Sequence, residues 1–394
     1  MNIIVCIVMN GWFQTKRYSK ITSLFDHLLE VSNKHASLLI DTQIYNSVLR
    51  AWMKSEHVDG PKKVESILSD MIQLYKAGDK NSRPNLDTFI FVMETFIRRN
   101  TNLCDVKIRQ LIGEMMDLKS NYVECEDLII NTTIIRNIEI KALAQRKDKN
   151  AAVEIDNIFQ DMIKAFRSGN ILLKPDGATF VNIMNSFKNN PTSSSVDRAT
   201  SLLSLASQMY DRGELIHDTN LYRIYNAALV TIARSRNERK AEKCRAILDE
   251  MKQYQTTGKN CFAPDVRSYN SVLNACAYTK GNASIRNLAL RIAVSTFNEL
   301  RESKELESNH VTYGTFLKVV GNLMPQSETK DKLIETVFKK CRTEGHVSVF
   351  VLQSLTDSAT PELCITLLGG DVEGEQGIIL PPEWSRKCDL EHDD

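Results

Sequence analysis

Residues 70–85, DMIQLYKAGDKNSRPN, contain a pattern that occurs twice more in the chain, at residues 161–176 and 250–265. In each copy an acidic residue and Met are followed by six residues, Gly, five residues, Pro, and then Asn or Asp. Successive copies begin 91 and 89 residues apart. Identical internal spacing at a fixed period is the signature of a repeat architecture. The 394 residues are therefore interpreted as a repeat array and not as separate globular domains.

Each interval between copies divides into two units, because a second set of similar positions lies midway between them. Counted at one aromatic position, the units fall at residues 45, 89, 136, 180, 225, 269 and 313. The steps are 44, 47, 44, 45, 44 and 44 residues. The sequence thus predicts about seven units of nearly equal length.

Each unit has the apolar spacing of two amphipathic helices. In the first full unit, apolar residues at 45, 48, 49, 52 and 53 form one helical face. Residues 64–75 form a second apolar stripe, with spacings of three and four. Gly78 stands where a left-handed residue ends a helix, and Pro84 prevents the helix from continuing. The pattern predicts an all-α solenoid of stacked antiparallel helix pairs, which bury their apolar stripes between neighbours.

The repeat frame predicts four regions: a partial N-terminal repeat (1–41), the array (42–345), C-terminal capping helices (346–370) and an acidic, irregular tail (371–394). The apolar run at residues 3–9 is interpreted as the first helix of a repeat. A signal peptide has basic residues before its apolar run, and none precedes this one. It is also shorter than the ~20 residues of a membrane span, so no membrane association is expected. No targeting segment is apparent, which leaves open a start further upstream.

The composition excludes several classes of function. The chain has 50 Lys and Arg against 49 Asp and Glu, so nucleic-acid binding would have to rest on a local groove. Nine cysteines occur singly without a CxxC motif, and seven histidines lack metal-ligand spacing. Phosphate-binding loops and the common hydrolase motifs are absent from the sequence. We therefore expect no enzyme activity, no cofactor and no metal.

Three stretches resemble the start of a pentatricopeptide repeat: IYNSVLRAW (44–52), PDVRSYNSVLNA (264–275) and VTYGTF (311–316). The ending of each unit, Met, then Gly, then Pro-Asp, is similar as well. The Trp-Leu-Gly-Tyr helix of tetratricopeptide repeats is missing. The resemblance implies a right-handed solenoid. The family's usual unit is about 35 residues, so these units hold roughly three extra residues between the helices and six before Pro. Both insertions lie in turns, where added length costs little free energy.

The resemblance also implies a ligand, single-stranded RNA, read at about one base per repeat. In the family, the residue after the aromatic position and the last residue of the unit contact the base edge. Amides and carboxylates at these places could bond a Watson–Crick edge, and by resemblance the pairs favour pyrimidines. The intervening units have Ile90 and Val181 instead and would be spacers. The implied pairs are Asn46 with Asn85, Asn137 with Asp176, Asn226 with Asp265, and Asn270 with Asn309.

A structural role for the same residues stays open. Asn or Asp before a helix is also a common N-cap, and Asn after Tyr suits a first helical turn. The family places apolar side chains two residues before the aromatic position to sandwich the bases, but only three of the seven are apolar here: Gln43, Asp87, Ile134, Ala178, Arg223, Arg267 and Val311. The basic run at residues 234–240 is either a phosphate contact or a solvated turn.

A second class of function is a protein-binding scaffold, because the groove of a solenoid also accepts a helix or an extended peptide. By resemblance, the chain is expected in mitochondria or plastids. There it would act on processing, stability or translation of transcripts, and protein partners in an RNA-processing complex are conceivable. The resemblance identifies neither the transcript nor the organelle.

Overall fold

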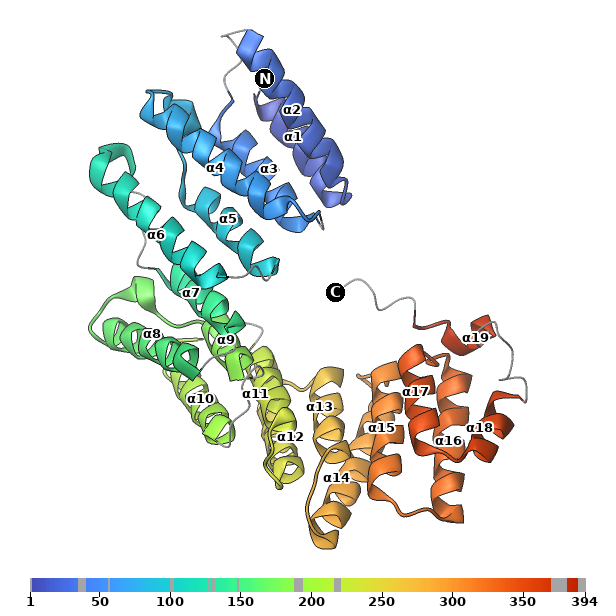
Figure 1. The fold of residues 1–394 in the computed structure, drawn as a ribbon. Coiled ribbons are helices and arrows are strands. Elements are labelled where there is room, and N and C mark those ends of the chain that lie inside the picture. Colours follow the sequence, from blue (N-terminus) through green and yellow to red (C-terminus); the bar gives the residue numbers. More distant parts are fainter. Residues whose placement is uncertain are drawn as a thin grey trace. The chain divides into compact units, whose positions relative to one another are not determined.

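The structure is a computed structural model that describes residues 2–34, 40–55, 57–99, 103–125, 128, 132–146, 149–187, 194–215, 221–369 and 381–388. Within these ranges the chain is all-helical, with 19 α-helices, four short 3₁₀ helices and no strand (Figure 1). The expected all-α, repeat-like architecture is confirmed. The chain divides into two compact units, Met1–Pro175 and Asp176–Asp394.

Unit 1 contains eight α-helices among its described residues: α1 (Asn2–Gln14), α2 (Tyr18–Lys34), α3 (Thr42–Lys54), α4 (Gly60–Lys76), α5 (Leu86–Arg98), α6 (Cys104–Asn121), α7 (Thr133–Gln145) and α8 (Lys149–Arg167). Its three 3₁₀ helices are η1 (Lys80–Ser82), η2 (Val123–Cys125) and η3 (Ile171–Leu173).

Unit 2 contains the remaining helices: α9 (Gly177–Phe187), α10 (Ser194–Asp211), α11 (Tyr222–Arg234), α12 (Lys240–Thr256), η4 (Asn260–Phe262), α13 (Val266–Ala277), α14 (Ala283–Glu302), α15 (His310–Leu323), α16 (Glu328–Glu344), α17 (Val349–Ser358), α18 (Pro361–Leu368) and α19 (Pro382–Ser385). Odd-numbered helices up to α17 are called first helices here, and each is followed by a second helix.

Within each unit the first helices form a continuous row. In unit 1, α3 contacts α1 and α5, and α5 contacts α7. In unit 2, contacts run from α9 through α11, α13 and α15 to α17. Each second helix also contacts the following first helix of its unit, as α4 does with α5 and α14 with α15. This order of contacts buries one apolar stripe of each helix between neighbouring pairs.

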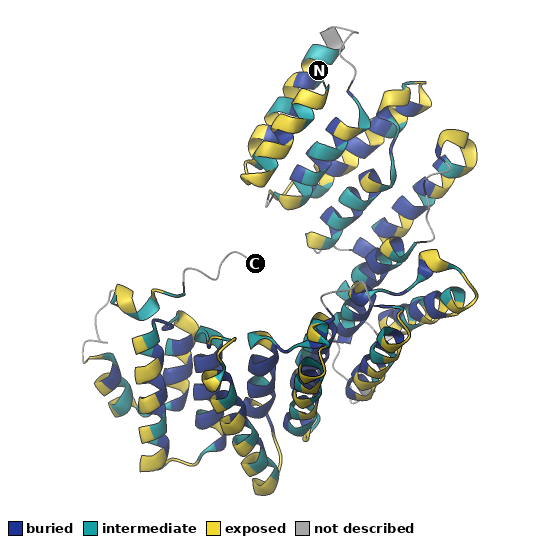
Figure 2. Ribbon diagram, turned by 180° about the vertical axis from the view of Figure 1, so that it is seen from behind, coloured by how far each residue is buried: buried dark blue, intermediate teal, exposed yellow. Residues whose placement is uncertain are grey.

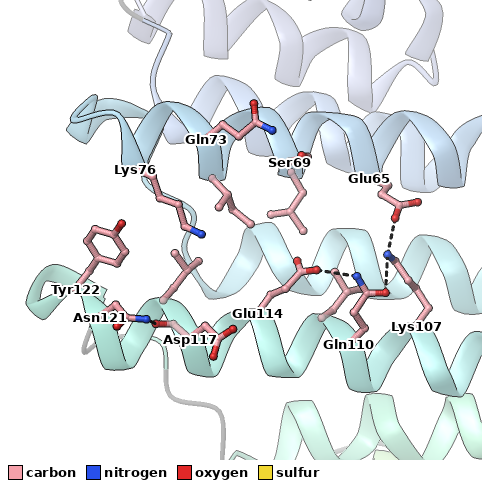
Figure 3. A pocket seen from close by; sticks show the side chains of 14 residues that line it. Glu65, Ser69, Gln73, Lys76, Lys107, Gln110, Glu114, Asp117, Asn121 and Tyr122 are labelled. Atoms are coloured by element: carbon pink, nitrogen blue, oxygen red, sulfur yellow. Dashed lines mark hydrogen bonds and ion pairs between the residues drawn. The ribbon is translucent and has the colours of Figure 1, made fainter.

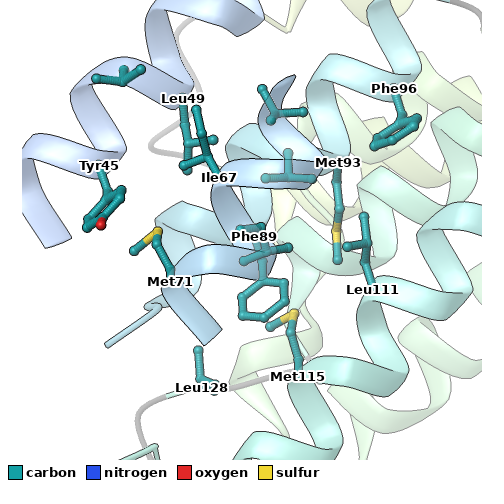
Figure 4. Close-up of a cluster of buried hydrophobic side chains, with 14 of the residues drawn as sticks. Tyr45, Leu49, Ile67, Met71, Phe89, Met93, Phe96, Leu111, Met115 and Leu128 are labelled. Atoms are coloured by element: carbon teal, nitrogen blue, oxygen red, sulfur yellow. The ribbon is translucent and has the colours of Figure 1, made fainter. Parts of the chain in front are cut away.

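The core of unit 1 shows how the stripes interlock (Figure 4). Phe89 on α5 is fully buried among side chains of the adjoining second helices, including Met71 on α4 and Met115 on α6. Phe89 is the aromatic-position residue by which the unit was counted. The six aromatic residues counted at this position are all buried, whereas Arg136, the seventh, is partly exposed and pairs with Glu139.

The predicted glycine stops have the conformation that ends a helix. Gly78, Gly169 and Gly258 have φ values of 105°, 101° and 83°, a left-handed conformation that favours glycine. The chain then forms a 3₁₀ turn in each copy: η1, η3 and η4. The extra residues before Pro, expected as a plain turn, therefore contain a helical turn whose last residue is buried: Ser82, Leu173 and Phe262.

Helix α19, the last one among the described residues, lies against α16. Beyond α17 and α18, which fall in the region predicted to cap the array, α19 contacts α16. The backbone N–H of Val347 donates to the carbonyl oxygen of Trp384 at 2.8 Å, and that of Lys387 donates to Gly345 at 3.0 Å. Part of the predicted irregular tail is thus helical and bonded to the array. The rest, residues 371–380 and 389–394, lies outside the described residues.

Candidate functional site

The predicted base-contact residues occupy two recurring places. Asn46, Asn226 and Asn270 lie in α3, α11 and α13, one residue after a buried tyrosine. Their partners are the N-caps of the next first helix: Asn85, Asp265 and Asn309. Each cap side chain accepts a hydrogen bond from a backbone N–H three residues on, in a capping box. The N-cap role considered from the sequence is therefore present.

Each of these three asparagines is hydrogen-bonded to its predicted partner. Asn46 Nδ2 donates to Asn85 Oδ1 at 3.1 Å, and Asn46 Oδ1 accepts from the Thr88 hydroxyl at 2.8 Å. The same oxygen, Asn85 Oδ1, also accepts a hydrogen bond from the backbone N–H of Thr88 at 3.0 Å. We call this set of first-helix Asn, N-cap and capping-box hydroxyl an asparagine clamp. It joins one first helix to the N-terminus of the next.

The clamp recurs in unit 2 with nearly the same geometry. Asn226 Nδ2 donates to Asp265 Oδ1 at 3.0 Å, and Asn226 accepts from Ser268 Oγ at 2.6 Å. Asn270 Nδ2 donates to Asn309 Oδ1 at 3.2 Å and accepts from Thr312 Oγ1 at 2.7 Å. In all three clamps, 39 residues separate the asparagine from the cap.

The fourth predicted pair falls on different units. Asn137 is a buried residue of α7 in unit 1. Asp176 is the first residue of unit 2, and its side chain accepts from the backbone N–H of Thr179 at 2.8 Å. Asn137 thus lies in a first helix, and Asp176 bonds the backbone N–H three residues on, as the N-caps of the other pairs do.

The sequence reasoning missed one further pair, Asn2 and Asp41. Asn2 Nδ2 donates to Asp41 Oδ2 at 2.9 Å, and Asp41 caps α3 by accepting from the backbone N–H of Ile44 at 3.0 Å. The separation is again 39 residues. Both residues stand 44 positions before Asn46 and Asn85, so the repeat step alone would have identified them.

Tyr225, the residue before Asn226 in α11, is buried beside the Glu250 carboxylate. Burial, together with the nearby Glu250 carboxylate, raises the pKa of Tyr225. The phenol therefore stays protonated and donates to Glu250 Oε1 at 2.8 Å, while Tyr254 donates to the same oxygen at 3.2 Å. These bonds anchor α11 to α12 behind Asn226, which keeps the asparagine in a fixed position.

The basic run at residues 234–240 connects α11 and α12. Lys240 is buried, and burial lowers its pKa. Its Nζ donates to the carbonyl oxygens of Ala233 at 3.0 Å and Ser235 at 3.4 Å, at the end of α11. Lys240 thus satisfies helix-end carbonyls. Arg234, Arg236 and Arg239 are exposed and remain the candidates for a phosphate contact in this turn.

A separate pocket of 470 Å³ lies between two second helices, α4 and α6 (Figure 3). Leu68, Ile72 and Leu111 give it an apolar lining, and Glu65 pairs with Lys107 at 2.5 Å beside it. Its volume suits a small molecule. None of the predicted base-contact residues lines this pocket.

Within the described part of the chain, no group of three or more His, Cys, Asp or Glu side chains could hold a metal ion. In the same residues, no helix has both the length and the apolar character needed to cross a bilayer.

No protein-family model matches the chain, and no curated protein matches it significantly in sequence. The pentatricopeptide resemblance therefore rests on the repeats of this chain, and base contact by the eight residues stays a prediction.

The clamp predicts a stability effect at Asn270. Asn270→Ala removes the nearer of two acceptors of the buried Thr312 hydroxyl and one bond to Asn309, so we expect unfolding free energy to fall by about 1–2 kcal/mol. Urea denaturation followed by circular dichroism measures this. The control is Asn274→Ala on the same helix, since the Asn274 side chain makes no hydrogen bond to described residues. Equal stability of the two variants would contradict the clamp.

Proposed function

We propose that the chain is a pentatricopeptide-like, right-handed α-solenoid that binds single-stranded RNA. It would act without catalytic activity of its own in the processing, stability or translation of mitochondrial or plastid transcripts. The supporting observation is the asparagine clamp, because it repeats one pair of polar side chains near the N-terminal end of three first helices, α3 in unit 1 and the consecutive α11 and α13 in unit 2. A regular row of this kind suits a polymer read one base per repeat.

The clamps leave specific hydrogen-bonding groups for a ligand. In the clamp at Asn226, the second amide N–H of Asn226 and the Oδ2 atom of Asp265 make no hydrogen bond to described residues. One donor beside one acceptor complements uracil, whose edge offers the O4 acceptor and the N3–H donor. This pair therefore favours uridine.

The other two clamps end in asparagine instead of aspartate. The Oδ1 atom of Asn309 already accepts from Asn270 and Thr312, so its amide N–H₂ is the group left over within the described residues. Asn85 has the same arrangement with Asn46 and Thr88. These pairs offer donors alone, which complements the N3 acceptor of cytosine. The clamps thus suggest a pyrimidine sequence with different bases at different units.

Positive charge accompanies two of the clamps. Arg223 and Arg267 are exposed and lie three residues before Asn226 and Asn270, so each shares a helix face with its asparagine. A guanidinium in this place could contact the phosphate beside a bound base. Binding would then rest on local charge, consistent with a net charge of only +1.

A protein-binding scaffold is the second candidate, favoured by apolar residues at corresponding positions of other units. Ile134 on α7 is half exposed, and Ile90 stands where α3 has Asn46. Salt separates the candidates: RNA affinity that depends on several phosphate contacts falls steeply between 50 and 200 mM salt, by about 10³-fold, whereas apolar contact does not.

Asp265→Asn is the variant that tests base reading without disturbing the clamp. The new side chain would keep the Oδ1 acceptor of the capping box but replace the Oδ2 acceptor with a donor, so we expect one position of the selected RNA to change from uridine to cytidine. The preference should change about 10-fold. In vitro selection from a random RNA pool with sequencing measures it.

The matched control runs in the opposite direction. Asn309→Asp should change the neighbouring position from cytidine to uridine, and neither variant should alter unfolding free energy by more than about 0.5 kcal/mol, because Asn and Asp cap equally well. Recovery of one unchanged RNA motif from both variants would disprove base reading by these pairs. Failure to recover any RNA would favour the scaffold.

A further inference from the structure

A cavity of 620 Å³ lies between the second helices α2 and α4, and we call it the α2–α4 cavity. Both helices pack on α3, which contributes Tyr45 and Trp52 to the floor. Both carry exposed residues on one side and buried residues on the other (Figure 2). Apolar side chains from all three helices line the cavity: Phe25, Leu29, Tyr45, Trp52, Ile67 and Leu74. This volume and this lining suit a small organic molecule.

Three places of the repeat hold smaller side chains around this cavity than in unit 2. In unit 2, Tyr225 and Tyr254 both donate to Glu250. The ring of Phe262 packs against both tyrosine rings, with centroids 5.4 and 4.9 Å away. Glu250, Tyr254 and Phe262 stand 25, 29 and 37 residues after Tyr225. At the same spacings after Tyr45 the chain has Asp70, Leu74 and Ser82. Less side-chain volume therefore surrounds Tyr45 than Tyr225.

The exchange of Glu for Asp also leaves a carboxylate without a partner. Asp70 is one methylene shorter than Glu250 and forms no hydrogen bond or ion pair with a described residue. It lies near the phenol of α3, because burial raises the pKa of Tyr45 and the Asp70 carboxylate adds to the rise. On the opposite wall, Asp26 of α2 is exposed and likewise has no bonded partner in the described chain. Two carboxylates thus line the cavity from facing helices.

The groove between α6 and α8 differs in this respect. A smaller cavity of 200 Å³ lies there. All of its lining carboxylates have ion-pair partners within the chain: Glu139 with Arg136, Asp105 with Arg146, and Glu154 with Arg109 and Arg146. Those acids are neutralised from inside the protein, whereas Asp26 and Asp70 are available to a cation from outside.

Only one end of the α2–α4 cavity suits a positive group. Lys63 lines the cavity on α4, seven residues before Asp70, which is about 10 Å along the helix. Its ammonium would repel a positive ligand group at that end. A ligand with one positive group therefore fits this cavity better than a polyamine, whose second ammonium would approach Lys63.

We propose that the α2–α4 cavity binds an organic cation, with one ammonium group beside Asp26 and Asp70 and an apolar body packed on the lining. Charge complementarity supports this occupant, because the two carboxylates have no cation of their own. The aromatic floor supports it as well, since an ammonium is attracted to the face of an aromatic ring. The proposal is independent of RNA binding, because none of these residues belongs to an asparagine clamp.

The probe is dansylcadaverine, in which a pentyl chain joins a primary ammonium to a naphthalene ring. Its N-acetyl derivative has the same body without the charge. We expect saturable binding of dansylcadaverine to the full chain by isothermal titration calorimetry. Asp70→Asn should weaken binding about 5-fold, and Asp26→Asn combined with Asp70→Asn about 20-fold, because each exposed ion pair contributes modestly. The N-acetyl derivative should bind the unaltered chain about 20-fold more weakly for the same reason.

Asp70→Glu combined with Leu74→Tyr tests the cavity itself, because it introduces the α12 residues at these places. The longer carboxylate would accept from the new phenol and from Tyr45, as Glu250 does in unit 2. The cavity would then be filled and its carboxylate bonded, so affinity should fall at least about 20-fold.

Asp117→Asn is the matched control. Asp117 is exposed, lines the pocket between α4 and α6, and also has no bonded partner among the residues that the structure describes. This variant should bind dansylcadaverine like the unaltered chain, and circular dichroism should be the same for every variant. Absence of saturable binding, or equal affinity for the N-acetyl derivative, overturns the proposal. Equal losses in the Asp117→Asn and Asp70→Asn variants also overturn it, because general surface charge would then attract the cation.

Discussion

Replacing Phe262 with alanine is expected to lower the unfolding free energy of unit 2 by about 3–5 kcal/mol. Phe262 is buried at the end of η4, with ring centroids 4.9 Å from Tyr210, 5.4 Å from Tyr225 and 4.9 Å from Tyr254. Truncation would leave a cavity between two second helices and a first helix. Urea denaturation, with hydrogen exchange across α11 and α12, measures the loss.

Two controls separate the anchor from the turn around it. Asn260→Ala changes an exposed residue of the same 3₁₀ helix and should cost less than about 0.5 kcal/mol. Ser82→Ala changes the equivalent buried position of η1, where the hydroxyl donates to Asp79 at 2.7 Å, and should cost about 1 kcal/mol. A cost below about 1 kcal/mol for Phe262→Ala would mean that the turn does not anchor the repeat.

The features that could be predicted from the sequence are those encoded locally. Gly78, Gly169 and Gly258 ended helices as expected, since the left-handed conformation favours glycine wherever it occurs. The spacing of apolar residues likewise predicted all-helical pairs. Such signals depend on a few neighbouring residues and not on what the helix later contacts.

The anchors of the 3₁₀ turns could not be predicted in the same way. Ser82, Leu173 and Phe262 share a place but neither size nor polarity, because each fills a cavity set by a different group of neighbours. The burial of Lys240 in a basic run is similar: only the end of α11 beside it explains why this lysine, and not Arg239, is enclosed.

The candidate residues illustrate both cases. Their positions on first helices and at N-caps followed from the repeat frame. That Asn226 would bond Asp265 required the packing of α11 against α13, which no local pattern specifies. The clamp changes their interpretation, since part of each side chain's bonding capacity holds helices together and only the remainder can meet a ligand.

Replacing Gly321 with valine is expected to lower unfolding free energy by about 3 kcal/mol. A Cβ atom at Gly321 on α15 would lie 2.4 Å from the hydroxyl oxygen, 2.7 Å from Cβ and 3.0 Å from Cα of Ser358 on α17. Because backbone is involved, a side-chain rotation cannot relieve the contact. We expect α17 to shift away from α15, which hydrogen exchange of residues 349–368 would detect as faster exchange.

Gly113→Val is the matched control, because a Cβ atom at Gly113 in α6 meets nothing within 4 Å. There the same change should alter stability by no more than about 0.5 kcal/mol, since both residues are modest helix formers. Gly314→Ala should cost less than Gly321→Val, because its Cβ would lie 2.5 Å from the ring of Phe350 on α17, a 36% exposed side chain that can rotate away. If the Gly321→Val and Gly113→Val changes had equal effects, the loss would reflect helix propensity. An effect confined to positions 314 and 321 would show that two glycines on one helix allow the close approach of α17.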